Sequence, residues 1–287
     1  MSSPKKLRPA SFLASALALS GFCSVLRSNA EATSPEFKVI AFYTGKGDQA
    51  HISWVREANA WFPQLAAKNN FTYSSTTNWN DLSADFLAGY QVVLFLDTRP
   101  DAPAQREAFR QYMDKGGAWM GFHFAAFALT PSAYPQNWDW YHEHFLGSGE
   151  YKGNTWRPTS AILRVEDQNH PTTRHLPETF QASPNEWYSW RNDLRTNSNI
   201  RILLSIDPTS YPLGTGPKPH EIWHKGYYPV AWSNKNYRMI YVNMGHNDID
   251  YEHKVDTTNK TLSFTFENDV QNRFITDCLL WLGTRKP

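Results

Sequence analysis

The stretch Asp114-Lys-Gly-Gly-Ala-Trp-Met-Gly-Phe-His-Phe-Ala-Ala126 decides the fold of this chain. Gly116 and Gly117 predict the end of a helix, because glycine adopts the left-handed backbone conformation at little steric cost. Ala118–Phe122 is apolar on both faces, as expected for a strand of a parallel sheet that helices cover. His123 follows at the carboxyl end of that strand, where open α/β sheets bind their ligands. We therefore take His123 as the first candidate site residue.

The neighbouring segments alternate between strands and helices. The helix before the stretch should be capped by Asp101, with Pro103 in its tolerant first turn. Asp48 should cap an earlier helix, whose apolar positions continue to about Ala67. Apolar segments predict strands at Phe37–Tyr43, Phe71–Ser75 and Val92–Leu96. Strand and helix alternate four times, which predicts an α/β fold with a doubly wound, mostly parallel sheet in three layers.

The second half of the chain is less regular. Asn137–Phe145 predicts a short helix, Thr155–Val165 predicts a strand, and Asn268 can cap a last helix that packs back on the sheet. Four further segments are expected to be extended: Glu186–Trp190, Ile202–Ile206, Pro229–Trp232 and Arg238–Asn243. No repeat or interdomain linker is present, so we expect residues 33–287 to form one domain.

The first 32 residues have the pattern of a cleavable signal peptide. Lys5, Lys6 and Arg8 form a basic region, Phe12–Phe22 is an apolar segment, and Ala30–Ala32 is an A-x-A cleavage site. The apolar segment is shorter than the roughly 20 residues of a membrane span. We expect a secreted or periplasmic protein that has no membrane anchor.

The composition of the mature chain bears on its partners and on how the fold is held together. The leader holds four of the 28 basic residues and one of the 27 acidic residues, so the mature chain has a net charge of −2. This charge gives no support for a nucleic-acid partner. Cys278 is the only cysteine that remains, so no intramolecular disulfide can form. Aromatic residues make up 15% of the sequence, which fits either dense packing or stacking against sugar rings.

Several short motifs, in their order and spacing, resemble the ThuA-like family, which is named for trehalose utilisation. The resemblance extends from about Phe37 to Gly283 and rests on these motifs: Gly-Phe-His at 121–123, Val-Glu-Asp-Gln-Asn-His-Pro at 165–171, Thr-Arg-His-Leu-Pro at 173–177, Asn-Glu-Trp-Tyr at 185–188, Pro-Val-Ala-Trp at 229–232 and Met-Gly-His at 244–246. It implies a flavodoxin-like, class I glutamine amidotransferase-like fold. It also implies a carbohydrate ligand of the disaccharide or 3-keto-glycoside class, and a sugar 3-dehydrogenase in the same pathway.

The comparison with amidotransferases argues against glutaminase activity. Class I amidotransferases carry their catalytic cysteine in a G-x-C-x-G elbow after a central strand. The corresponding residues here are Gly121–Ala125, with His123 in the position of the cysteine. An imidazole does not readily form the thioester that glutamine hydrolysis requires.

Four residues form the predicted catalytic group. The ordinary pKa of histidine suits His123 to acid–base chemistry or to metal binding. Glu186 is its predicted carboxylate partner, and Tyr188 shares a face with Glu186 if that segment is extended. His246 ends a strand-like segment much as His123 does. Each residue also has a purely structural interpretation, as a hydrogen-bonded or packed side chain.

Three residues are predicted to contact substrate. They are His51, which follows the loop after the first strand, and the two indoles Trp187 and Trp232. The alternative for both tryptophans is a place in the hydrophobic core. Loops at the carboxyl ends of parallel strands can converge, which would bring His51 close to the other two histidines of the candidate site.

Three functions remain open from the sequence. The first is a keto-sugar lyase, hydrolase or isomerase, in which a histidine–glutamate pair removes a proton beside a ketone. The second is a carbohydrate-binding protein without turnover. The third is a metal-dependent hydrolase in which the histidines at 51, 123 and 246 bind a divalent ion such as zinc. The resemblance itself implies no metal or other cofactor.

Overall fold

The centre of the molecule is formed by the apolar segments that the sequence marks as buried strands. In the computed structural model these are β1 (Lys38–Phe42), β3 (Val92–Phe95), β4 (Ala118–Phe122) and β11 (Arg238–Val242). Every residue of β3 and β4 is buried, as a strand covered on both faces requires. The structure describes residues 34–131, 137–155, 158–210, 226–247 and 263–284. The predicted signal peptide lies outside these ranges.

The main sheet has a parallel half and an antiparallel half. Its nine strands lie in the order β2-β1-β3-β4-β11-β10-β9-β6-β7, and β5 pairs with β8 in a separate small sheet. The pairs from β2 to β11 are parallel, whereas those from β11 to β7 are antiparallel. The remaining strands are β2 (Thr72–Thr76), β5 (Tyr151–Asn154), β6 (Ile162–Val165), β7 (Thr179–Gln181), β8 (Tyr188–Trp190), β9 (Ile200–Ile206) and β10 (Tyr228–Asn234).

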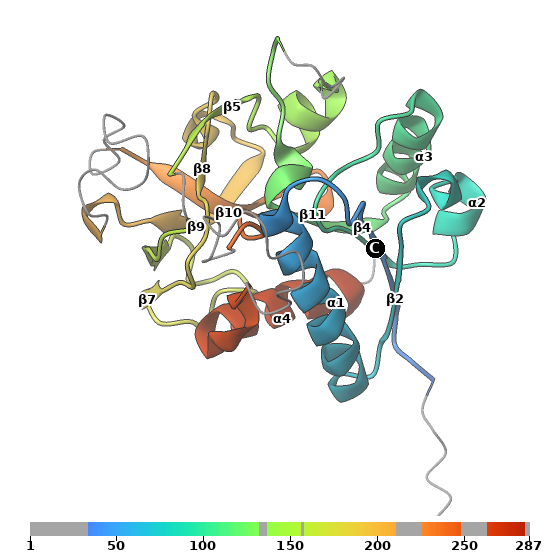
Figure 1. The fold of residues 1–287 in the computed structure, drawn as a ribbon, viewed down its shortest axis with the longest axis horizontal. Helices are drawn as coiled ribbons and strands as arrows, with labels where there is room; N and C mark the ends of the chain where they lie inside the picture. Colours follow the sequence, from blue (N-terminus) through green and yellow to red (C-terminus); the bar gives the residue numbers. More distant parts are fainter. Residues whose placement is uncertain (1–33, 132–136, 156–157, 211–225, 248–262, 285–287) are drawn as a thin grey trace, which may run out of the picture. The chain divides into compact units, whose positions relative to one another are not determined.

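Helices cover both faces of the sheet, so the predicted α/β class and its three layers are confirmed. One core contains side chains of α1 (Gln49–Lys68) and α4 (Asp269–Thr284), which lie together on one face (Figure 1). The other core contains side chains of α2 (Ala84–Leu87), α3 (Pro103–Asp114) and the single-turn π-helix η3 (Trp140–Phe145). Short 3-10 turns complete the structure: η1 (Trp79–Asp81), η2 (His123–Ala126), η4 (Leu194–Thr196), η5 (Pro208–Ser210) and η6 (Thr265–Glu267).

The predicted helix caps are confirmed at two helices and wrong at a third. Asp48 accepts a hydrogen bond from the second residue of α1, and Asn268 accepts one from Gln271 in α4. The N-cap position of α3 is occupied by Ala102, which makes no side-chain cap. Asp101 lies one residue too early to cap α3, and its carboxylate is instead 3.8 Å from the Arg106 guanidinium.

One predicted strand begins later than expected. The segment predicted as a single strand over 155–165 contains β6 only from Ile162 onward, whereas the preceding β5 ends at Asn154. The two strands belong to different sheets, because β5 pairs with β8 and β6 pairs with β7 and β9. A local hydrophobic pattern cannot indicate such a change of partner.

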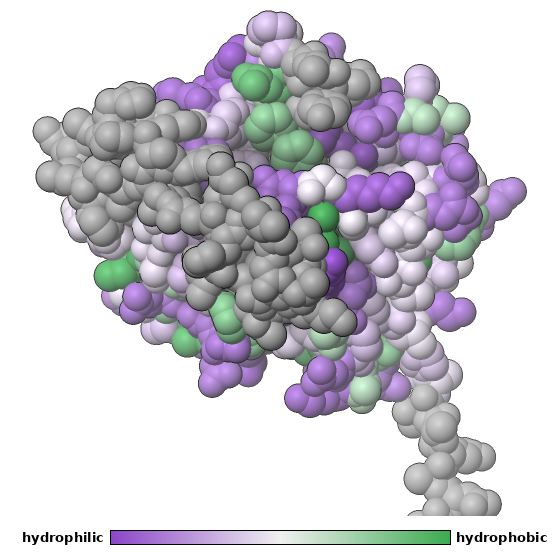
Figure 2. All heavy atoms as spheres, viewed as in Figure 1, coloured by the Kyte–Doolittle hydropathy of each residue, from purple (hydrophilic) through white to green (hydrophobic). Residues whose placement is uncertain are grey.

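The described surface is mostly polar. In the face shown in Figure 2, hydrophobic residues form small, separate groups. Ile162, at 40%, is the one large hydrophobic side chain classed as exposed in the described ranges. None of the helices in these ranges has the length and apolar content needed to cross a membrane.

Candidate active site at the carboxyl edge of the sheet

His123 is held in an elbow immediately after β4. Its φ angle is +42°, a left-handed conformation that non-glycine residues rarely adopt and that is concentrated at functional sites. The imidazole Nε2–H donates to the main-chain oxygen of Glu186 at 2.8 Å, and the hydroxyl of Tyr241 donates to the His123 carbonyl at 2.8 Å. The ring lies against Tyr188, with 3.9 Å between centroids. The hydrogen bond to Glu186 and the contact with Tyr188 therefore fix the direction of this imidazole, while Tyr241 holds its backbone.

His246 reaches the same place from the loop that follows β11. The preceding Gly245 has a φ angle of +150°, and a Cβ atom there would lie 2.8 Å from the Cβ of His123. Only glycine allows the two loops to approach so closely. The side-chain oxygen of Asn185 accepts hydrogen bonds from the N–H groups of Gly245 (2.9 Å) and His246 (3.2 Å). This loop is therefore tied to the Asn-Glu-Trp-Tyr segment.

His51 enters the cluster from the first turn of α1, which Asp48 caps. Its ring centroid lies 5.2 Å from that of His123 and 4.7 Å from that of His246. The ring also hydrogen-bonds to the main chain of Gly245. Its side chain is partly accessible, but its Nδ1 atom is buried. The three predicted loop ends thus meet at one edge of the sheet.

The Glu186 carboxylate lies between two of these histidines. Its Oε2 atom is 2.7 Å from Nδ1 of His246 and 3.6 Å from Nε2 of His123. Its Oε1 atom accepts a hydrogen bond from the side-chain amide of Asn154. All three members of this group are buried, with exposed fractions of 0% for His123, 3% for Glu186 and 5% for His246. The carboxylate is therefore held firmly in a site with little solvent.

Burial keeps two of the imidazoles neutral. Desolvation lowers the pKa of His51 and of His123 well below the ordinary value, and the neighbouring histidines lower both further. A neutral imidazole can still donate through one nitrogen while the other nitrogen presents a lone pair. Nδ1 of His51 and Nδ1 of His123 are both buried, and neither has a hydrogen-bond partner. A buried polar atom without a partner costs about 1–3 kcal/mol, so these two atoms call for a functional explanation.

Tyr188 lies in the site, but its environment keeps it un-ionised. Burial, followed by the nearby Glu186 carboxylate, raises the pKa of the Tyr188 phenol well above its ordinary value. The ring packs against His123 on one side and Tyr151 on another. Tyr188 can therefore act as a neutral group that supports the imidazole and not as a phenolate.

The two tryptophans that were predicted to contact substrate occupy the core instead. Both indoles have an exposed fraction of 0%. The Trp187 indole N–H donates to the carbonyl of Thr159 at 2.7 Å, and that of Trp232 donates to the carbonyl of Leu146 at 2.9 Å. Trp232 also packs 4.4 Å from Tyr241. Neither ring presents a free face to a sugar in this structure, which favours the packing interpretation for both.

The sequence did not single out three residues that build this site. Asn154 binds the Glu186 carboxylate, Asn185 binds the His246 loop, and Gly245 allows the two loops to approach. Asn185 and Gly245 lie inside motifs that carry the family resemblance, so a signal was present for both. Asn154 had no such signal, because its contact depends on the pairing of β5 with β8.

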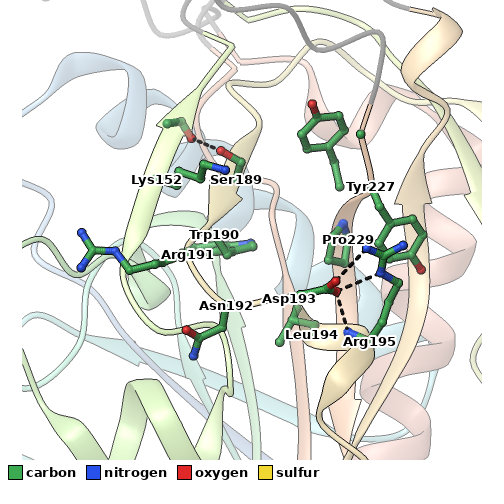
Figure 3. A pocket seen from close by; sticks show the side chains of 13 residues that line it. Lys152, Ser189, Trp190, Arg191, Asn192, Asp193, Leu194, Arg195, Tyr227 and Pro229 are labelled. Carbon is green, nitrogen blue, oxygen red and sulfur yellow. Dashed lines mark hydrogen bonds and ion pairs between the residues drawn. The ribbon is translucent and has the colours of Figure 1, made fainter.

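A separate surface pocket of about 520 Å³ lies beside β8 and contains none of the histidines of the site (Figure 3). The Arg195 guanidinium in this pocket binds the Asp193 carboxylate at 2.7 Å and lies 4.6 Å from the centre of the Tyr227 ring. Arg191 pairs with Glu150 at 2.6 Å. Both guanidinium groups are therefore already bound to carboxylates. The left-handed φ of His123 and the two imidazole nitrogens without partners lie at the histidine cluster, together with the buried Glu186 carboxylate, so we place the candidate active site there.

Comparison with known proteins agrees with this architecture. The family model for ThuA, described as trehalose utilisation, matches residues 38–260. The crystal structure of a ThuA-like protein from Bacteroides uniformis ATCC 8492 is 35% identical, with a TM-score of 0.75 over 87% of this chain and 92% of that one.

A second ThuA-like protein, from Parabacteroides merdae ATCC 43184, shares the fold at 17% identity, with a TM-score of 0.59 over 88% of this chain and 93% of that one. No match was found among proteins with curated descriptions. The family model covers more than half of the chain, and the first of these structures is well above 30% identical. The chain therefore belongs to the ThuA family.

Proposed function

We propose that this protein is an enzyme of carbohydrate catabolism that acts on a keto sugar at the cluster of His51, His123, Glu186 and His246. The observation that carries the proposal is the position of the Glu186 carboxylate, which is buried and held 2.7 Å from Nδ1 of His246 at the carboxyl edge of the sheet. A fixed carboxylate beside imidazole rings is an arrangement suited to proton transfer. The family description, trehalose utilisation, supports a disaccharide-derived substrate.

The proposed reaction begins beside a ketone of the sugar. Glu186 accepts the proton from the carbon next to the carbonyl, and the electron pair of that C–H bond forms an enediolate. Return of that proton to the former carbonyl carbon, while the hydroxyl proton of the first carbon passes to the former carbonyl oxygen, gives an isomeric ketone. Alternatively, the electron pair expels the glycosidic oxygen on the β-carbon, and that oxygen takes the proton that Glu186 had accepted. His246 and Asn154 hold the two carboxylate oxygens of Glu186 throughout.

Glutamine hydrolysis is not part of this proposal. The elbow that holds the catalytic cysteine in class I amidotransferases carries His123 here, with the backbone strain retained. Cys278, the one cysteine outside the predicted leader, is buried in α4. A binding protein without turnover is the weaker alternative, because Trp187 and Trp232 are packed in the core.

The test is to incubate the protein with 3-keto-trehalose, and separately with trehalose, and to follow both sugars by NMR. We expect the keto sugar to be consumed, with turnover lowered about 100-fold or more in Glu186→Gln, since general acid–base catalysis contributes about 10²–10⁴-fold. The matched control is Glu143→Gln, which changes an exposed glutamate of η3 in the same way. Saturable shifts of the sugar signals without conversion would instead establish a binding protein.

We also propose that the protein is exported and that a sugar 3-dehydrogenase supplies its substrate. Support for export comes from the basic, apolar and A-x-A segments within residues 1–32. Fractionation of the native host, followed by N-terminal sequencing of the recovered protein, tests this proposal. A cytosolic protein with an intact leader would contradict it.

A further inference from the structure

We propose that His51, His123 and His246 bind a single divalent transition-metal ion of the zinc class. One ring nitrogen from each histidine lies within 4.8 Å of the other two. Tetrahedral zinc with Zn–N bonds of 2.0–2.1 Å needs nitrogens that are about 3.3 Å apart. The centroid separations of 4.7–5.6 Å show three rings already gathered around one point. The nitrogens need to approach one another by at most about 1.5 Å for all three to reach a single ion.

The hydrogen bonds assign the ligand atom on each ring. Nε2–H of His123 donates to the carbonyl of Glu186, which leaves the Nδ1 lone pair of His123 as the ligand. The ring of His51 bonds to the main chain of Gly245, and its Nδ1 has no hydrogen-bond partner. Nδ1 of His246 faces the Glu186 carboxylate, so this ring offers Nε2.

This pattern is the one found around metal-binding histidines. Such a histidine almost always gives its second ring nitrogen to a carbonyl or a carboxylate, which fixes the tautomer and the orientation of the ring. Two of the three rings here face main-chain groups, and the third faces a carboxylate.

The donor set selects the metal. Three imidazoles without a thiolate suit zinc, and also cobalt, nickel or copper, whereas magnesium and calcium prefer oxygen ligands. Three protein ligands leave a fourth position open, which is typical of catalytic zinc sites. The ion would supply Lewis acidity toward a sugar carbonyl, with Glu186 remaining beside it as the proton acceptor. That catalytic role rests on the proposed function, whereas the binding of the ion does not.

The test begins with full-length protein that is purified without a histidine tag and then stripped with a chelator. Calorimetric titration with Zn²⁺ should show one equivalent bound, and Co²⁺ should produce the visible absorption bands of a tetrahedral site. We expect His51→Ala, His123→Ala and His246→Ala each to weaken zinc binding by at least 100-fold. Glu186→Gln should weaken it by about 10–100-fold, as is usual for a residue that orients a ligand. The matched control is His175→Ala, which changes an exposed histidine and should leave binding unchanged.

Nitrogen NMR of the unmodified protein provides a measurement that does not depend on whether variants fold. Zinc should shift the Nδ1 signals of His51 and His123 and leave the Nε2 signal of His123 in its carbonyl-bonded position. Folded protein that binds no stoichiometric metal would overturn the proposal, and so would binding that all three substitutions leave intact. Zinc binding without turnover of the keto sugar would refute only the proposed function. Full turnover by stripped protein that still binds zinc would refute only the catalytic role of the ion.

Discussion

Replacing Asn185 should lower the stability of the fold and also disturb the assembly of the candidate site. Its buried amide makes four hydrogen bonds within the site. It donates to the carbonyls of Glu186 (2.9 Å) and Asn243 (2.8 Å) and accepts from the N–H groups of Gly245 (2.9 Å) and His246 (3.2 Å). Asn185→Ala removes all four hydrogen bonds and so loosens the loop that carries His246, which then keeps the main-chain hydrogen bond from the Glu186 N–H to the His246 carbonyl (2.8 Å).

The cost of this substitution can be worked out from the groups left behind. The N–H groups of Gly245 and His246 lose their acceptor, at about 1–3 kcal/mol for each buried donor, or about 2–6 kcal/mol together. The carbonyl of Glu186 still accepts from Nε2 of His123, so its loss is smaller. Water entering the space left by the amide would bring the total toward the lower end of this range. We therefore expect a loss of about 2–4 kcal/mol in the free energy of unfolding.

Asn234 offers a matched control at the opposite edge of the sheet. It is 3% exposed, against 2% for Asn185, and its amide also bridges main-chain groups. It donates to the carbonyls of His144 (3.0 Å) and Phe145 (2.9 Å) and accepts from the N–H of Asn236 (2.9 Å). Asn234→Ala deprives one buried N–H and two carbonyls of their partner, so it should also lower stability, without disturbing the three histidines of the candidate site.

Urea unfolding followed by circular dichroism gives the stability of each variant, and zinc calorimetry gives the state of the site. Both variants should unfold at lower urea concentration. Only Asn185→Ala should also lose zinc affinity, by about 10–100-fold, because it acts on the residues that orient the ligands. Equal zinc affinity in the two variants would refute the positioning role of Asn185. A negligible change in stability for Asn185→Ala would refute the calculation of its cost.

Three further predictions follow from single contacts. Gly245→Ala should lower the free energy of unfolding by more than Gly116→Ala. Both positions have a positive φ, which costs a side chain about 1–3 kcal/mol, but only at Gly245 would the new Cβ collide with His123. Equal losses in urea unfolding would contradict this prediction. Cys278 should not react with a thiol reagent until the protein unfolds, because burial raises the pKa of its thiol well above the ordinary value. Labelling of the native protein would refute this prediction. Trp232→Phe should lower the free energy of unfolding by about 1–3 kcal/mol, because the indole hydrogen bond is lost, and should leave the KM for the keto sugar unchanged. A raised KM would instead support the predicted contact of Trp232 with substrate.

Most of the parallel half of the sheet could be predicted from local patterns. Val92–Phe95 and Ala118–Phe122 are continuous apolar segments, and the structure buries every residue in both. Gly116 has the positive φ expected at the end of a helix. The prediction was wrong for the first part of the segment over 155–165, because β6 begins only at Ile162. Local hydrophobic periodicity reports which face is buried, but not which strand lies alongside.

The sequence by itself determined the strands and helices of the parallel half of the sheet, and the place of His123 directly after a buried strand. These features depend on neighbouring residues, through side-chain periodicity and the conformational freedom of glycine. The tertiary structure decided that His51, His123 and His246 meet, and that Glu186 lies between two of them. It also decided that Trp187 and Trp232 are core residues. Such contacts join residues far apart in the chain, and only the order of strands in the sheet and the packing of helices against it can bring them together.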